Sequence, residues 1–201
     1  MKYCLKQILN PCKTPLQKKP LFSDFNRNPA PDFSKPLDLL GACHDKIRFH
    51  CELLVKLCKY LESNAVDADA LKSAKQVHRY FSTSARLHHL DEEEDLFPTL
   101  NSKTEPASSV RELIIKLQQE HVVLEHQWQI FENVLKNQAL VELPDMTEQA
   151  LEMKARYDQH IDSENRFILP EAEKLLSREE IVLLGEAMQK RRQQFNDAFN
   201  Q

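Results

Sequence analysis

A histidine followed four residues later by a glutamate occurs twice in this chain, each time in the same local setting. In each copy an apolar residue and a proline follow at the same offsets: His88, Glu92, Phe97 and Pro98, and His160, Glu164, Leu169 and Pro170. Residues four apart lie on one face of an α-helix, one turn apart. An imidazole and a carboxylate in this position can hold a divalent metal ion, and a carboxylate can bridge two ions. The repeat therefore predicts two similar helices that carry the same chemistry.

Glycine is too scarce for a fold built on tight turns. Only Gly41 and Gly185 occur among 201 residues, whereas the turns of β-rich folds call for glycine. The content of 41% hydrophobic and 29% charged residues is that of a soluble globular domain. No apolar run is long enough to span a bilayer, and residues 1–10 lack the apolar stretch of a secretory signal. We predict one all-α domain with no membrane partner.

Apolar residues recur at helical spacing in five stretches, with prolines at the junctions. We predict helices over about residues 36–62, 69–96, 109–135, 147–168 and 178–199. Pro98 and Pro170 are expected to end the second and fourth helices, because the residue before a proline disfavours helical geometry. Ser82-Thr83-Ser84 is expected to bend or break the second helix. The predicted N-caps are Ser34, Asp67 or Asp69, Ser108 or Ser109, Thr147, and Ser177 in a capping box with Glu180.

Four long helices joined by short loops predict an up-down-up-down four-helix bundle, with the fifth helix packed outside it or across one end. We assign residues 36–201 to this bundle and its C-terminal helix. Residues 1–35 contain five of the ten prolines and seven Lys or Arg against two acids, so we expect an extended, disordered, basic arm. The arm could touch a polyanion, although a solvated arm is the simpler interpretation.

Charge and cysteine content limit the partners and the compartment. Residues 36–201 carry a net charge of −9, which disfavours nonspecific binding to nucleic acid. The five cysteines are odd in number and form no Cys-x-x-Cys pair, which indicates reduced thiols in a cytoplasmic protein. Cys43, Cys51 and Cys58 share roughly one side of the first helix and are interpreted as small core residues, with a thiol sensor as the alternative.

The histidines and glutamates in the predicted bundle suit two metal ions. A surface His–Glu pair one turn apart is by itself only a weak helix-stabilising contact, of about 0.2–0.5 kcal/mol. The same offsets on alternate helices change that interpretation, because a bundle core cannot hold several such groups without ligation or full hydrogen bonding. We predict that four terminal ligands and two bridging carboxylates bind the metals: His44, His88, His121 and His160, with Glu92 and Glu164 as bridges. Two iron or manganese ions suit this set, whereas one zinc needs only about four ligands.

The complete motif set resembles the hemerythrin-like cation-binding domain family. The resemblance rests on His44-Asp-Lys-Ile-Arg, on Glu120-His121, and on the two His-x-x-x-Glu motifs with their Leu96-Phe97-Pro98 and Ile168-Leu169-Pro170 endings. It covers about residues 37–173 and implies a non-haem di-iron site in a four-helix bundle. Oxygen-carrying hemerythrins place a second histidine four residues after the third-helix one, and this chain has Glu125 there.

Several positions around the predicted site stay open. His89 and Glu93 compete with His88 and Glu92, but the distance from Pro170 to His160 and Glu164 selects His88 and Glu92 by analogy. His89 and Glu93 would then lie in an outer layer or at the surface. Glu125 is a possible additional ligand, and Tyr157 could face the site or belong to the core. His50, His78 and His126 are interpreted as ordinary polar positions.

These features predict a non-haem di-iron protein that senses or handles O2, NO, peroxide or iron itself. Its partner would be a small diatomic or peroxide ligand, and no organic substrate is implied, although slow turnover of peroxide or NO is compatible with the site. One alternative is a metal-dependent regulatory or partner-binding helical module. Another is a reversible O2 carrier, which the glutamate at position 125 disfavours because a more anionic site stabilises the oxidised metal. The sequence leaves the oligomeric state open.

Overall fold

The computed structural model describes residues 31–137 and 139–199, and this part of the chain contains helices and no strand. The predicted all-α class is therefore confirmed for these residues. Nearly all of the predicted N-terminal arm, residues 1–30, lies outside the described residues. The helices in chain order are α1 (Pro36–Leu61), α2 (Ala68–Tyr80), η1 (Phe81–Ala85), α3 (Arg86–Asp91), η2 (Glu92–Leu96), α4 (Phe97–Lys103), α5 (Ser109–Lys136), η3 (Leu140–Met146), α6 (Thr147–Ser163), η4 (Glu164–Ile168), α7 (Leu169–Leu175) and α8 (Arg178–Phe199).

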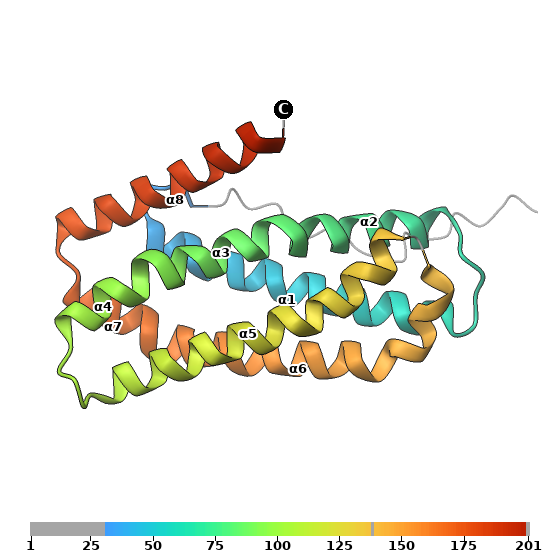
Figure 1. Cartoon of the computed structure of the whole chain (residues 1–201), viewed down its shortest axis with the longest axis horizontal. Coiled ribbons are helices and arrows are strands. Elements are labelled where there is room, and N and C mark those ends of the chain that lie inside the picture. Colours follow the sequence, from blue (N-terminus) through green and yellow to red (C-terminus); the bar gives the residue numbers. More distant parts are fainter. Residues whose placement is uncertain (1–30, 138, 200–201) are drawn as a thin grey trace, which may run out of the picture.

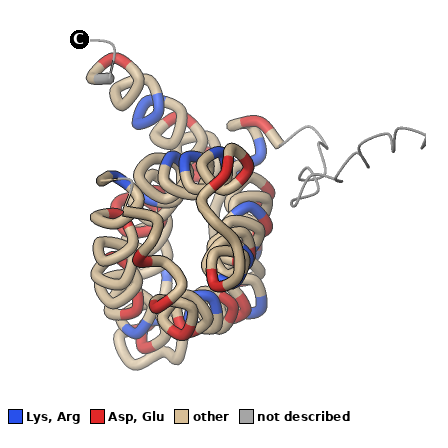
Figure 2. The backbone as a smooth tube through the Cα atoms, turned by 90° about the vertical axis from the view of Figure 1, so that its right-hand side faces the viewer, with Lys and Arg blue, Asp and Glu red and all other residues tan. Residues whose placement is uncertain are grey.

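The long helices form four rods that lie alongside one another (Figure 1). The first is α1, the second runs without interruption from α2 through α4, the third is α5, and the fourth runs from α6 through α7. α1 packs against α2 and α6, and α5 packs against the same two helices. Viewed end on, the rods surround a common axis and the C-terminal helix lies outside the ring (Figure 2). Four helices therefore share one interior.

The predicted caps are confirmed at three helix starts. Asp67 accepts a hydrogen bond from the backbone N–H of Ala70 at 2.9 Å, and Ser108 accepts one from Arg111 at 3.4 Å. Ser177 and Glu180 form the predicted capping box, since each side chain accepts from the backbone N–H of the other.

The predicted caps Ser34 and Thr147 are wrong. The hydroxyl and the backbone N–H of Ser34 both bond the Asp32 carboxylate, and Lys35 holds the N-cap position of α1 without a side-chain bond. Thr147 is already the first residue of α6, and its hydroxyl donates to Glu62 at 2.8 Å. The threonine thus ties the start of α6 to the end of α1.

Pro98 and Pro170 do not end their helices, which corrects the sequence prediction. Each proline is the second residue of a helix, α4 or α7, that directly follows a π-helical turn. In these turns the N–H of Phe97 donates to the carbonyl of Glu92, five residues back, and Leu169 donates to Glu164 in the same way. Proline fits just after such a turn because the first positions of a helix do not need its missing N–H.

A third π turn, η1, covers the Ser82-Thr83-Ser84 stretch that was expected to bend or break the helix. The Thr83 hydroxyl donates to the carbonyl of Arg79, at the expense of the regular backbone pattern. The rod continues into α3, so the local effect is a widened turn and not a break.

The apolar core is divided into two clusters. One contains Leu54, Phe81 and Trp128, and the other contains Phe97 and Ile114. Along every rod the predicted metal ligands fall between residues of the two clusters. A polar layer therefore crosses the interior at one level, with apolar packing above and below it. Cys51 and Cys58 lie buried in the first cluster, as predicted for small core residues.

His50 belongs to this core and not to the polar layer. Its ring stacks on Tyr80 with centroids 3.8 Å apart, and its Nδ1–H donates to the carbonyl of Lys46 at 2.7 Å. Burial, aided by the charge of Lys46, lowers the pKa of His50 from 6.5 to about 4. The unfolded chain therefore takes up the proton first as the pH falls, and folding stability should drop between pH 6.5 and pH 4.

We expect His50→Phe to remove this loss of stability. Phenylalanine keeps an aromatic ring for Tyr80 and has no proton to bind, so the variant should be less sensitive to acid by up to about 3 kcal/mol at pH 4. Urea unfolding of both proteins at matched metal content from pH 7.5 to pH 4 measures the difference. His126→Gln, at an exposed position of α5, is the control that should keep the wild-type profile. Parallel profiles for wild type and His50→Phe would contradict the prediction.

Candidate metal centre

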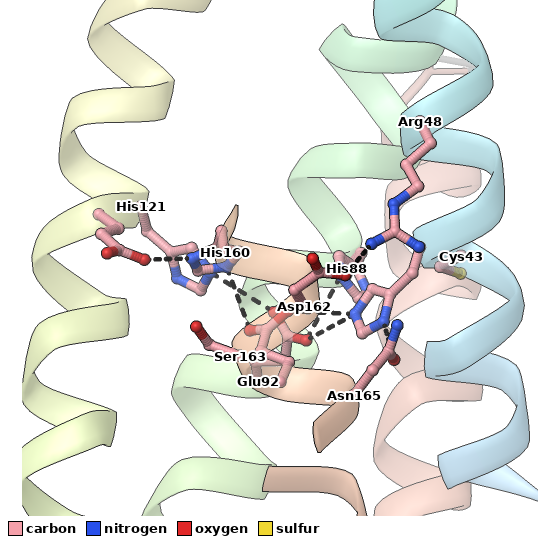
Figure 3. A network of polar contacts seen from close by, with 12 residues as sticks. Cys43, Arg48, His88, Glu92, His121, His160, Asp162, Ser163 and Asn165 are labelled. Atoms are coloured by element: carbon pink, nitrogen blue, oxygen red, sulfur yellow. Dashed lines mark hydrogen bonds and ion pairs between the residues drawn. The ribbon is translucent and has the colours of Figure 1, made fainter. Parts of the chain in front are cut away.

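All six predicted ligands converge in the polar layer, and no more than 4% of any of them is exposed. Every rod contributes to the group: His44 from α1, His88 from α3, Glu92 from η2, His121 from α5, His160 from α6 and Glu164 from η4. Figure 3 shows four of these side chains between the helices: His88, Glu92, His121 and His160. The two glutamates open the π turns η2 and η4, and π turns are frequent at functional sites.

Glu92 lies between histidines from three different helices. Its Oε1 atom lies 3.3 Å from Nε2 of His88 and 3.6 Å from Nε2 of His44. Its Oε2 atom lies 3.5 Å from Nε2 of His121. One oxygen of the Glu92 carboxylate thus faces His44 and His88, and the other faces His121.

Glu164 repeats this arrangement. Its Oε2 atom lies 3.2 Å from Nε2 of His44, and its Oε1 atom lies 3.1 Å from Nε2 of His160. The Nε2 atoms of His121 and His160 are 2.9 Å apart. Two ligand atoms ~2.1 Å from one ion and at right angles to each other lie about 3 Å apart, so these spacings suit shared coordination.

The donors form two overlapping groups in which all ligand atoms lie within 4.8 Å of one another. The first half of the site consists of His44 and His88 with Glu92 and Glu164. The second half consists of His121 and His160 with the same two glutamates. Two nitrogens and two oxygens therefore surround each of two neighbouring positions, and both carboxylates belong to both.

Several buried nitrogen and oxygen atoms that could bind a metal form no hydrogen bond with any described residue. They include Nε2 of His44, Oε2 of Glu92 and both carboxylate oxygens of Glu164. Buried polar groups left in this state are costly, whereas cations placed between them would satisfy them. The residues therefore fit a pair of cations.

The charges of the layer are strongly coupled. Burial and the neighbouring Glu164 raise the pKa of Glu92 to about 6. Burial alone would raise the pKa of Glu164 too, but His160 and His44 hold it well below its usual value. Burial likewise opposes protonation of His44, yet Glu164 and Glu92 raise its pKa to about 10. In the absence of metal, protons on histidine balance the two carboxylates.

Three of the four histidines are oriented from outside the layer. Nδ1 of His44 donates to Oδ1 of Asn165 at 2.7 Å. Nδ1 of His121 donates to Glu93 at 2.8 Å, and Nδ1 of His160 donates to Glu120 at 2.9 Å. Such bonds fix the tautomer and leave Nε2 free for a metal.

Neither Asn165 nor Glu120 was predicted to act at the site, although Glu120 belongs to the Glu120-His121 motif, and Glu93 was predicted to lie in an outer layer or at the surface. The available signal was that each directly neighbours a predicted ligand: Asn165 follows Glu164, Glu93 follows Glu92, and Glu120 precedes His121.

The structure places the three residues whose role at the site the sequence left open: His89, Glu125 and Tyr157. The ring of His89 stacks on His121 with centroids 4.1 Å apart, and His89 belongs to neither donor group. Glu125 is exposed on α5 and accepts from Gln129 at 3.4 Å, so it is not a ligand in this geometry. Tyr157 is buried in the core, its ring 5.7 Å from that of Phe81.

The two remaining histidines also lie outside the donor groups. His78 is half-buried with Nε2 3.9 Å from Oε1 of Glu132, and His126 is exposed on α5.

A third buried carboxylate lies directly beside the centre. Asp91 is fully buried one residue before Glu92, and its oxygens lie 2.5 Å from Arg191 and 2.6 Å from Arg192. Arg191 also contacts Asp95 at 2.6 Å. Both arginines belong to α8, so the outer helix is anchored on the rod that carries Glu92.

The helical rods and their two overlapping His/Glu groups define a helical protein built to bind metal cations. The chain belongs to the hemerythrin family, since the hemerythrin HHE cation-binding domain matches residues 35–172. This match confirms the resemblance inferred from the motifs. A Haemophilus influenzae protein described as an uncharacterized protein is 30% identical over 162 residues, which cover 80% of this chain and 92% of that protein. Among the residues that the structure describes, no helix is both long and apolar enough to cross a membrane.

Proposed function

We propose that this protein holds two non-haem iron ions in an up-down-up-down four-helix bundle and uses them to sense or handle O2, NO, peroxide or iron itself. The observation that carries the proposal is the placement of Glu92 and Glu164. Each directs one oxygen toward a histidine of the first half of the site and the other oxygen toward the second half. This is the arrangement expected of carboxylates that bridge two ions.

The donor set favours iron over zinc. Imidazole nitrogens together with carboxylate oxygens suit iron and manganese, which accept more than four ligands. Zinc is usually satisfied by four donors and would be saturated by each half of the site. When bound, the iron ions would supply redox chemistry and open coordination positions for a small ligand. Manganese remains the alternative metal.

The residues of the chain supply position and environment. Glu92 and Glu164 would hold both cations at once, and Asn165, Glu93 and Glu120 keep three imidazoles turned inward. The two apolar clusters exclude water from either side of the layer. A dry site strengthens its electrostatic interactions and limits access to small molecules.

Reversible O2 carriage is the less favoured function. The position where oxygen-carrying hemerythrins have a further histidine is Glu125, and this side chain points to solvent. The centre therefore has four histidines and two carboxylates from the described residues. A lower share of imidazole makes the site harder and more anionic, which favours the oxidised metal.

Anaerobic reconstitution with Fe(II) tests the proposal. We expect two iron ions per chain and, after O2 is added, a near-ultraviolet ferric absorption that does not reverse on deoxygenation. Iron counting and absorption spectroscopy on the same sample give both results. A colour that disappears on deoxygenation would restore the carrier function. No iron uptake, or tight binding of a single zinc, would reject the di-iron proposal.

A metal-dependent regulatory or partner-binding module is the second candidate, favoured by one contact. Arg191 and Arg192 of α8 form ion pairs with Asp91, the residue before Glu92. A change in the position of Glu92 would therefore be transmitted to α8. Capture of a partner that depends on both metal and α8 would support this function. Unchanged ligand chemistry after loss of α8 contacts would support the first.

We place the protein in the cytoplasm as part of the same proposal, because Cys43, Cys51 and Cys58 are all free thiols.

A further inference from the structure

We propose that the two halves of the centre take up cations in a fixed order, with the His121–His160 half filled before the His44–His88 half. The proposal rests on the two-cation centre proposed above. It concerns the residues that accept hydrogen bonds from Nδ1 of the histidines, on the side of each ring away from the cations. The halves share Glu92 and Glu164, so a difference between them must arise from the histidines and their surroundings.

Carboxylates stand behind both histidines of the second half. Glu93 accepts from Nδ1 of His121 at 2.8 Å, and Glu120 accepts from Nδ1 of His160 at 2.9 Å. A carboxylate in this position draws the Nδ1 proton and increases the electron density at Nε2, which strengthens the bond to a metal. The two charges also attract a cation directly.

Among the residues that the structure describes, the first half has no charged group in the same role. Nδ1 of His44 donates to the neutral amide oxygen of Asn165, and Nδ1 of His88 is buried without a hydrogen bond from the described residues. The nearby Asp91 carboxylate is already paired with Arg191 and Arg192. The surroundings of this half are therefore neutral or compensated.

Solvent reduces the difference but does not remove it. Glu93 and Glu120 are 36% and 33% exposed, and Lys116 lies 3.4 Å from the second oxygen of Glu120. These conditions screen the charges. Outer partners of metal-bound histidines change metal affinity by about 10–100-fold each, and screening places the expected effect near 10-fold per carboxylate.

The test is an anaerobic titration of the metal-free protein with Fe(II) in competition with a coloured chelator. We expect two binding steps whose dissociation constants differ by at least ~10-fold. Glu93→Gln and Glu120→Gln should each weaken the first step by about 10-fold and leave the second nearly unchanged. Glutamine retains an oxygen acceptor, so the change reports the charge and not the loss of the hydrogen bond.

Two further variants separate the explanation from a general charge effect. Asn165→Asp places a carboxylate behind His44 and should strengthen the second step, which brings the two constants closer together. Glu125→Gln removes the same charge from an exposed position of α5 and should leave both steps unchanged. Circular dichroism of each metal-free variant verifies that it is folded.

The outcomes distinguish this proposal from the di-iron function. Fewer than two ions bound by the wild type would reject the di-iron centre itself. Two ions bound with equal affinity, or equal weakening of both steps in Glu93→Gln and Glu120→Gln, would reject the order of filling and leave the di-iron centre standing.

Discussion

Replacing Glu92 and Glu164 together with glutamine is expected to abolish the two-cation centre while the chain remains helical. These side chains supply the only oxygen donors in the two groups formed by the described residues, and each oxygen serves one half of the site. Glutamine keeps the volume and polarity of each side chain but removes two negative charges from the layer proposed to hold the cations. The loss in affinity should exceed the ~10–100-fold effect of removing an outer partner.

Thermal unfolding with and without Fe(II) under anaerobic conditions measures this effect. At a thousandfold excess over the dissociation constant, one bound ion stabilises the folded state by about 4 kcal/mol. For a chain of this size that corresponds to a rise in Tm of roughly 8–16 °C per ion. The double variant should show no rise, and iron counting should find no bound metal.

The matched control carries the same change in charge at two exposed positions, Glu125→Gln with Glu148→Gln. It should bind two ions and show the full rise in Tm. If the Glu92/Glu164 variant behaved like this control, the bridging role of the two carboxylates would be wrong.

Removing both arginines from Asp91 is expected to destabilise the protein by about 3–5 kcal/mol, the typical cost of leaving a buried charge without its partner. Asp91 is fully buried, and burial already raises its pKa despite both guanidinium groups. In Arg191→Ala/Arg192→Ala nothing on α8 would compensate that charge. Urea unfolding at pH 7, read by circular dichroism, gives the loss in free energy of unfolding.

Adding Asp91→Asn to the double variant is the control for this interpretation. The amide has no charge to desolvate, so the triple variant should recover most of the lost stability. Arg192 also lies 5.5 Å from the ring centre of Phe33, and Arg191 also pairs with Glu94 and Asp95. The part that is not recovered measures these contacts and the lost packing. A double variant that loses less than ~1 kcal/mol would show that Asp91 does not depend on α8.

The sequence was sufficient for the helical rods and for the set of residues in the polar layer. Apolar periodicity located the helices, and the repeated spacing of His88–Glu92 and His160–Glu164 predicted the two His–Glu pairs that the structure places in the polar layer. The lone histidines His44 and His121, on the first and third predicted helices, completed the predicted set, and the structure brings them into the same layer. Local patterns carry this information because helical spacing alone determines which residues share a face.

The remaining features depend on contacts that no local pattern contains. The bond from His44 to Asn165 joins residues 121 positions apart, and that from Arg192 to Asp91 spans 101 positions. The π turns were also missed, because Pro98 and Pro170 signal a helix end when only near neighbours are considered. Tertiary packing keeps the second rod helical through Pro98 and the fourth rod helical through Pro170.

The π turns at Glu92 and Glu164 also limit how the length of this chain can change during evolution. In an α-helix each added or deleted residue turns everything beyond it by about 100°. A π turn already contains one extra residue, since the N–H of Phe97 bonds the carbonyl of Glu92 five residues back. Loss of one residue there would leave an ordinary α-helical turn and keep Phe97 and Leu100 in the apolar cluster that they share, whereas an added residue would rotate them out of it. Insertions should therefore be rejected in these two short stretches. The loop between α4 and α5 can vary in length without turning a ligand away from its partners.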